Sequence, residues 1–200
     1  MYSGAVAGTE QRILDAAVGE AAAVGLERLT MDGVARRAGV NRATVYRYFG
    51  DRDSLVAAMA ARDTSDGLAV LAAAQARADN PVDATINAVV DLLGWARAHP
   101  FITRAAREEP GWLIAAGMSD DAAMLRRSVA AGAAVIATWY RGPTPAEQIA
   151  ETLARLLFSF VLLPSSISID LDDPAALRAY VRNTVAPWVS APAEPDQSPS

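Results

Sequence analysis

The 200-residue chain contains no cysteine, no lysine and a single histidine. Without cysteine there is no disulfide framework, no thiolate metal ligand and no thiol nucleophile. His99 has no second histidine at ligand spacing, so the sequence predicts no metal site and no other cofactor. No G-x-S-x-G segment is present to suggest a serine hydrolase. We therefore expect no catalytic residues and no enzymatic activity.

Long apolar runs and a secretory leader are also missing. The longest uncharged stretch, residues 156–169, has 14 residues and includes Pro164, whereas a membrane-spanning helix needs about 20 apolar residues. The N-terminus lacks a basic start followed by an apolar core. We therefore expect a cytoplasmic protein with no membrane association.

Alanine and helix-spaced apolar residues dominate the composition. The hydrophobic fraction is 52%, which is sufficient for a buried core, and apolar residues recur three and four positions apart rather than alternating. The pattern predicts an all-α protein. The net charge is −5, yet five arginines stand between Thr30 and Arg52 against two acids, so positive charge is concentrated there.

The stretch from Thr30 to Arg52, TMDGVARRAGVNRATVYRYFGDR, predicts a helix, a tight turn and a second helix. Thr30 is placed to cap a helix from Met31 to Ala38, and Gly39 supplies the residue that tolerates a positive φ. Asn41 is placed to cap a second helix that ends near Tyr48. These signals together predict a helix-turn-helix.

The outward face of that second helix is cationic and hydrogen-bonding, which suits a DNA groove. It carries Arg42, Ala43, Thr44, Tyr46 and Arg47. An ordinary helix end at Gly39 and a merely solvated arginine face are the simpler interpretations of each signal alone. The coincidence of the glycine turn, the arginine-rich face and the TVYRYF segment favours DNA binding over these simpler interpretations.

Proline and capping residues divide the remainder of the chain. We expect a flexible arm over residues 1–8, a helix-turn-helix domain over 9–50, a second domain over 51–190 and a disordered tail over 191–200. Thr144 and Glu147 predict a capping box at the start of a strongly apolar helix. His99-Pro100 is interpreted as a helix terminator.

The TVYRYF segment, preceded by TMDGVARRAGV and followed by GDRDSL, resembles the TetR family of transcriptional regulators. The resemblance is specific over Thr9–Ala57. It implies an all-α fold with a three-helix N-terminal DNA-binding domain and a C-terminal bundle of about six helices for ligand binding and dimerisation. It also implies a homodimeric repressor that binds a palindromic double-stranded DNA operator and is released by a small apolar or amphipathic effector.

The resemblance also assigns roles by position. Thr30 matches a phosphate contact at the start of the second helix, and Arg52 matches another at the head of the fourth. Arg42 and Thr44 match positions that reach bases or phosphates, and Tyr46 and Tyr48 match aromatic positions beside the DNA. The full predicted DNA-binding set is Thr30, Asn41, Arg42, Ala43, Thr44, Tyr46, Arg47, Tyr48 and Arg52.

The C-terminal half supplies two further predicted sites. Aromatic and apolar residues with two polar groups define a hypothetical effector pocket: Leu92, Trp95, His99, Phe101, Arg104, Trp112, Met118, Met124 and Phe158. The apolar faces of the last two helices define a hypothetical dimer interface: Leu153, Leu157, Phe160, Val161, Leu177, Tyr180, Val181, Val185 and Trp188. A deeper core within one chain is the alternative to that interface.

Two other functions remain open from the sequence. One is a helical small-molecule-binding or enzymatic protein whose head does not read DNA. The other is a DNA-binding regulator that uses no ligand. A salt-dependent DNA complex would exclude the first.

Overall fold

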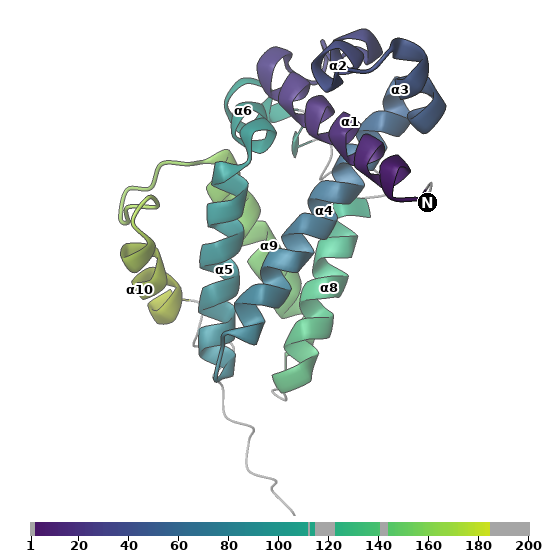
Figure 1. Ribbon diagram of the computed structural model, residues 1–200. Helices are drawn as coiled ribbons and strands as arrows, with labels where there is room; N and C mark the ends of the chain where they lie inside the picture. The colour runs from purple at the N-terminus through teal and green to yellow at the C-terminus, as the bar shows by residue number, and fades with distance from the viewer. Residues whose placement is uncertain (1–2, 112, 115–122, 141–143, 185–200) are drawn as a thin grey trace, which may run out of the picture. The chain divides into compact units, whose positions relative to one another are not determined.

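The computed structural model describes residues 3–111, 113–114, 123–140 and 144–184, and within them every regular element is a helix (Figure 1). The all-α prediction is confirmed. The helices are α1 (Ser3–Val24), α2 (Met31–Ala38), α3 (Arg42–Phe49), α4 (Arg52–Ala76), α5 (Pro81–Ala98), α6 (Pro100–Glu108), α8 (Ala123–Trp139), α9 (Ala146–Leu162) and α10 (Pro174–Thr184). Since α1 begins at Ser3, residues 3–8 are helical rather than the predicted flexible arm.

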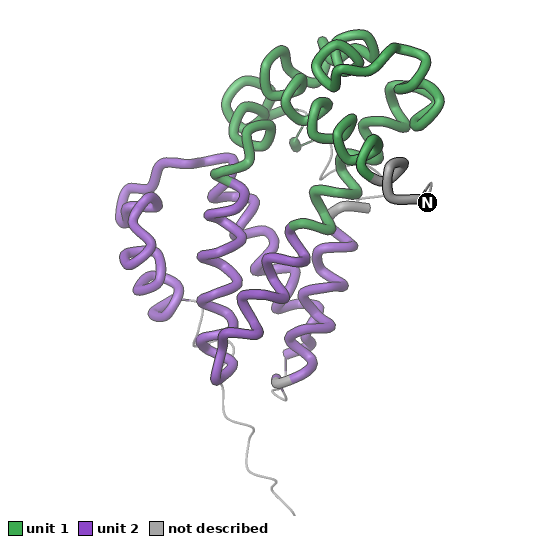
Figure 2. Tube along the Cα trace, in the orientation of Figure 1, with its two compact units in different colours: residues 1–66, 97–116 green, residues 67–96, 117–200 purple. Residues whose placement is uncertain are grey.

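The chain divides into two compact units (Figure 2). The first contains residues 1–66 and 97–116, and the second contains residues 67–96 and 117–200. The sequence predicted a boundary at residue 50, which is too early, because Leu55 and Met59 on α4 are buried together with the helix-turn-helix. None of the described helices is long and apolar enough to cross a lipid bilayer.

The core of the first unit takes fully buried apolar side chains from four helices. Ile13 on α1, Val34 on α2, Val45 on α3 and Leu55 on α4 are all fully buried. Such side chains each contribute about 1.5–3 kcal/mol when removed from water. They hold the helix-turn-helix against α1 and the start of α4.

A buried carboxylate joins α1 to α2. Glu20 is only 9% exposed and lies 3.4 Å from Arg37 and 3.8 Å from Arg36. Gly33 of α2 makes this possible, since a Cβ at that position would overlap with the Glu20 carboxylate. Arg36 and Arg37 remain solvent-facing beyond this ion pair.

The end of α1 is capped by side chains from the segment around α6. Arg104 donates hydrogen bonds to the carbonyl oxygens of Ala22 and Ala23, at 3.2 and 3.1 Å. Glu109 accepts one from the backbone N–H of Leu26, at 3.1 Å. These contacts satisfy groups that a helix end leaves unpaired, and they explain why α6 belongs to the first unit.

The second unit has two apolar clusters that share α9. In one, Ile86, Val89 and Leu93 of α5 pack with Leu177 and Val181 of α10. The other joins α8 to α9 and is formed by Ala133, Ile136, Tyr140, Ile149 and Ala150. Because α9 contributes to both clusters, more than one of its faces is covered within the chain, as its apolar sequence predicted.

Of two predictions about helix ends, one is wrong and the other is confirmed. Pro145 occupies the cap position of α9 without any side-chain cap hydrogen bond, so the Thr144 capping box does not form. His99-Pro100 ends α5 at Ala98, as predicted, and His99 also caps α6, because its Nδ1 accepts a hydrogen bond from the N–H of Ile102 at 3.3 Å. Pro100 occupies the first helical position of α6, where its missing N–H leaves no helical hydrogen bond unmade.

Candidate nucleic-acid interface and ligand cavity

The turn between α2 and α3 sets the orientation of the proposed reading helix. Gly39 has φ 66° and ends α2 in the left-handed conformation, and Asn41 caps α3 by accepting from the N–H of Thr44 at 2.8 Å. Val45 and Phe49 are buried against the first unit. Since these two residues point inward, Arg42, Ala43, Tyr46 and Arg47 are exposed on the opposite face.

Arg42 is the centre of a small side-chain cluster on this face. Its Nη1 lies 3.1 Å from a carboxylate oxygen of Asp32 on α2, and its Nη2 donates to the hydroxyl of Tyr46 at 3.1 Å. The guanidinium carbon is also 5.1 Å from the centre of the Tyr46 ring. The hydrogen bond to Tyr46 and, next, the charge of Asp32 raise the pKa of Arg42 above its usual value.

The remaining residues of the face are ordered by similar short-range contacts. Arg47 stacks on the ring of half-buried Tyr48, at 5.4 Å from its centre. The hydroxyl of Thr44 donates to the side-chain oxygen of Asn41 at 2.9 Å. Pre-ordered donors of this kind lose less conformational entropy when they bind a ligand.

Thr30 and Arg52 have structural roles at the edge of the face. The hydroxyl oxygen of Thr30 accepts from the N–H of Gly33 at 3.0 Å and caps α2. Arg52 donates to the carbonyl oxygens of Leu26 and Leu29, at 2.6 and 3.1 Å. The guanidinium predicted to hold a phosphate also holds the α1–α2 loop in place, a role that no local pattern indicated.

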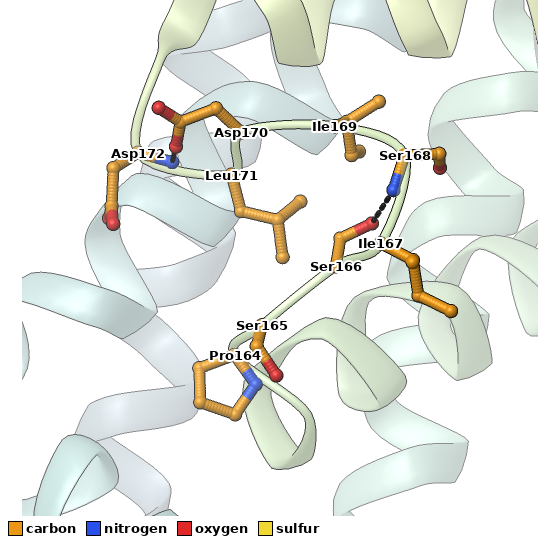
Figure 3. Close-up of a pocket in the computed structure, with 9 residues that line it drawn as sticks. All are labelled: Pro164, Ser165, Ser166, Ile167, Ser168, Ile169, Asp170, Leu171 and Asp172. Atoms are coloured by element: carbon orange, nitrogen blue, oxygen red, sulfur yellow. Dashed lines mark hydrogen bonds between the residues drawn. The ribbon is translucent and has the colours of Figure 1, made fainter.

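A cavity of about 100 Å³ lies in the second unit, enclosed by α4, α5, α8 and α9. Its wall is mainly aliphatic, with the neutral polar residues Gln75, Thr85 and Ser128, and no charged side chain belongs to the described lining. A larger hollow of about 570 Å³ is a bend of the single loop Pro164–Asp172 (Figure 3). Because the smaller cavity is walled by four helices, it is the better candidate for holding a ligand.

The predicted effector pocket agrees poorly with this cavity. Of the described residues proposed for it, only Leu92 lines the wall. His99, Phe101 and Arg104 belong to the first unit, and Trp95 and Phe158 are half-buried away from the wall. The side chains of Trp112, Met118 and Met124 lie outside the described residues. The two sets differ in kind, since the residues that line the cavity are mainly aliphatic or small, whereas the predicted set is rich in aromatic residues.

The predicted dimer interface is also partly wrong. Leu177 and Val181 are 3% and 0% exposed within the single chain, so they form its core instead of a subunit contact. Leu153 and Leu157 line the cavity. Phe160, Val161 and Tyr180 pack on the same core cluster while remaining half-exposed. Val185 and Trp188 lie outside the described residues.

Solved structures share the fold of the chain. The repressor AlkX from Dietzia sp. is 21% identical and superposes with a TM-score of 0.64 over 90% of this chain and 94% of its own. A TetR-family regulator from Pectobacterium atrosepticum is 18% identical, with a TM-score of 0.68 over 96% and 100%. The fatty acid degradation regulator FadR from Bacillus halodurans is 15% identical, with a TM-score of 0.63 over 88% and 98%.

The sequence comparison points to the same group of proteins. No curated protein is significantly similar to the chain in sequence. Residues 13–59, which include the whole helix-turn-helix, match the model of the N-terminal region of bacterial regulatory proteins of the tetR family. Together with the geometry of α2 and α3, this match identifies residues 13–59 as an N-terminal helix-turn-helix region of the TetR family, in a chain whose all-α fold is shared with solved TetR-family structures.

Proposed function

We propose that the protein is a homodimeric repressor that binds a palindromic operator through α3 and is released by a small uncharged effector. The observation that carries the DNA-binding part is the exposed row of Arg42, Tyr46 and Arg47, held in position by the caps of α2 and α3. Arginine forks and phenol hydroxyls are the groups that contact base edges and phosphates. Because the proposed operator is DNA, we propose that the protein acts in the cytoplasm.

Two heads related by a twofold axis would read two half-sites. The half-sites are then separated by about 34 Å or a multiple of it, the length of a helical turn of DNA. The half-exposed residues of α9 and α10, including Phe160 and Tyr180, support a subunit contact in the second unit.

The cavity in the second unit supports release by an effector. Its aliphatic wall and lack of described charges favour an uncharged, mainly aliphatic molecule, oriented by Gln75 or Ser128. One structural relative carries a name that fits such chemistry, since AlkX is implicated in the biodegradation of n-alkanes, which are uncharged and aliphatic. We propose no enzymatic activity.

Selection of genomic fragments followed by footprinting tests the DNA-binding proposal. The purified protein should retain fragments that share a palindromic site and should protect both half-sites. Arg42→Ala combined with Tyr46→Ala should weaken operator binding by about 1–3 kcal/mol per half-site. Arg155→Ala, on α9 in the second unit and paired there with Glu151, removes the same charge and should leave operator binding unchanged. Unaltered affinity of the double variant, or protection of a single half-site by a monomer, would contradict the proposal.

A further inference from the structure

An exposed carboxylate stands within a surface that has to approach DNA phosphates. The side chain of Asp32 is 57% exposed and that of Arg42 is 61% exposed, and their closest N and O atoms are 3.1 Å apart. An exposed ion pair of this kind stabilises a fold very little. The carboxylate would also repel the phosphate backbone, so its presence beside Arg42 calls for a functional explanation.

The explanation lies in the hydrogen-bond donors of Arg42 that the carboxylate leaves unoccupied. A guanidinium has five N–H donors. Asp32 occupies one on Nη1 and Tyr46 occupies one on Nη2. Three donors remain, and the contact with O6 and N7 of guanine requires two.

A phosphate and a base edge differ in how they respond to Asp32. A phosphate that binds Arg42 brings a full negative charge next to the carboxylate, and the two like charges repel. Guanine presents neutral acceptors, which add no such repulsion. The carboxylate therefore penalises one use of Arg42 and spares the other.

We propose that Asp32 is a specificity-determining residue that discourages Arg42 from acting as a phosphate clamp and reserves it for the acceptor edge of a purine, preferentially guanine. The inference rests on the proposed DNA-binding function of α3. It predicts that Asp32 weakens binding to unrelated DNA more than binding to the operator. The simpler alternative is that Asp32 only complements the positive end of α2, where it lies in the first turn.

Asp32→Asn tests the proposal, because asparagine retains the size and an acceptor oxygen but removes the charge. Binding of the full-length protein to a selected operator fragment and to an unrelated duplex of equal length is measured by fluorescence anisotropy at several salt concentrations. The variant should bind the unrelated duplex about two- to fivefold more tightly per head, the range expected for one exposed charge pair. The slope of log K against log salt should steepen by about one for each Arg42 that gains a phosphate. Operator binding should change less, so discrimination falls.

Two controls separate this role from a general effect of charge. Asp15→Asn removes the same charge from an exposed acid of the first unit that pairs with Arg62, outside the predicted DNA-binding set, and it should not reduce discrimination. In the Arg42→Ala background, Asp32→Asn should tighten binding to the unrelated duplex no more than it tightens binding to the operator. Thermal unfolding monitored by circular dichroism checks that each variant is folded.

The possible outcomes are distinct. An Asp32→Asn variant that discriminates as well as the original protein, or an Asp15→Asn variant that loses discrimination equally, overturns the role of Asp32. If Asp32→Asn lowers the thermal stability and leaves discrimination unchanged, the result supports the helix-end alternative and overturns the proposed role of Asp32 in specificity. An original protein that prefers no sequence contradicts the proposed function itself.

Discussion

At the scale of single residues, the first unit depends on a few backbone positions that only glycine occupies without strain. Gly25 has φ 86° and ends α1, and Gly39 has φ 66° and ends α2. The two differ in their surroundings. A side chain on Gly39 would meet open space, whereas one on Gly25 would overlap with the carboxylate of Glu109.

This difference predicts unequal effects of the same substitution. Gly39→Ala should lower the free energy of unfolding by about 1–2 kcal/mol, the cost of the left-handed conformation. Gly25→Ala should cost about 1–3 kcal/mol more, since Glu109 is displaced from the N–H of Leu26 and a charge-assisted hydrogen bond is lost. Urea unfolding followed by circular dichroism measures both. In the Glu109→Ala background the two substitutions should become equally costly, and a persistent difference would refute this explanation.

At the scale of helices, most helix N-termini are determined by a side chain that accepts a hydrogen bond from a backbone N–H of the first turn. Thr30, Asn41 and Asn80 do so for α2, α3 and α5. Asp51 does so for α4, accepting from the N–H of Ser54 at 2.8 Å. The hydrogen bond from that backbone N–H, followed by the one from the Ser54 side chain, lowers the pKa of Asp51.

The lowered pKa predicts a pH-dependent contribution of Asp51 to stability. A carboxyl group whose pKa is lower in the folded state stabilises the fold above its unfolded pKa of about 3.9, and this contribution is lost as the pH falls through the folded value. The stability advantage of the original protein over Asp51→Asn should thus be constant above about pH 5 and should shrink below about pH 4. Urea unfolding at pH 7, 5, 4 and 3 measures it.

Ser54→Ala is the matched control for the pH experiment. It removes the side-chain hydrogen bond but retains the backbone N–H that contributes most to the pKa shift. Its pH profile should therefore remain close to that of the original protein. Parallel profiles for Asp51→Asn and the original protein down to pH 3 would show that the charge on Asp51 is unimportant.

At the scale of the whole molecule, α4 is one continuous helix that contributes to both units. Its first part, with Leu55 and Met59, is buried in the unit that carries α3, and its last turns, with Leu71 and Gln75, line the cavity of the second unit. If occupation of the cavity changes DNA affinity, operator DNA must change effector affinity by the same factor. The proposed release of DNA therefore requires a ligand that binds two states of the protein with different affinities.

Filling the cavity predicts a loss of ligand binding without loss of DNA binding. Cyclohexanol, an uncharged six-carbon probe, should stabilise the original protein by about 1.4 kcal/mol at ten times its dissociation constant. This corresponds to a rise in Tm of about 3–6 °C for a chain of this size. Ala88→Leu, in the cavity wall, should abolish the rise and still bind the operator.

The control for this experiment is Ala73→Leu, which adds the same side chain at an exposed position of α4. It should retain the response to cyclohexanol. Hexanoate at pH 7 should produce a smaller rise than cyclohexanol, because no charged group in the described lining compensates a buried carboxylate. Equal shifts in Ala88→Leu and the original protein would place the ligand elsewhere.

The sequence by itself determined the helix-turn-helix and its outward face. The cap at Thr30, the glycine at Gly39 and the cap at Asn41 act within a few residues of the chain, so their effect does not depend on distant contacts. The same local periodicity turned Val45 inward and Arg42 outward.

Only the tertiary structure decided which surfaces those helices meet. Leu177 and Val181 form core instead of an interface, and Arg52 binds two loop carbonyls from residues more than 20 positions away. The pairing of Asp32 with Arg42 likewise requires α2 and α3 to cross at their observed angle. Helical periodicity specifies which side of a helix is apolar, but the partner of that side is set by long-range packing, which no short pattern encodes.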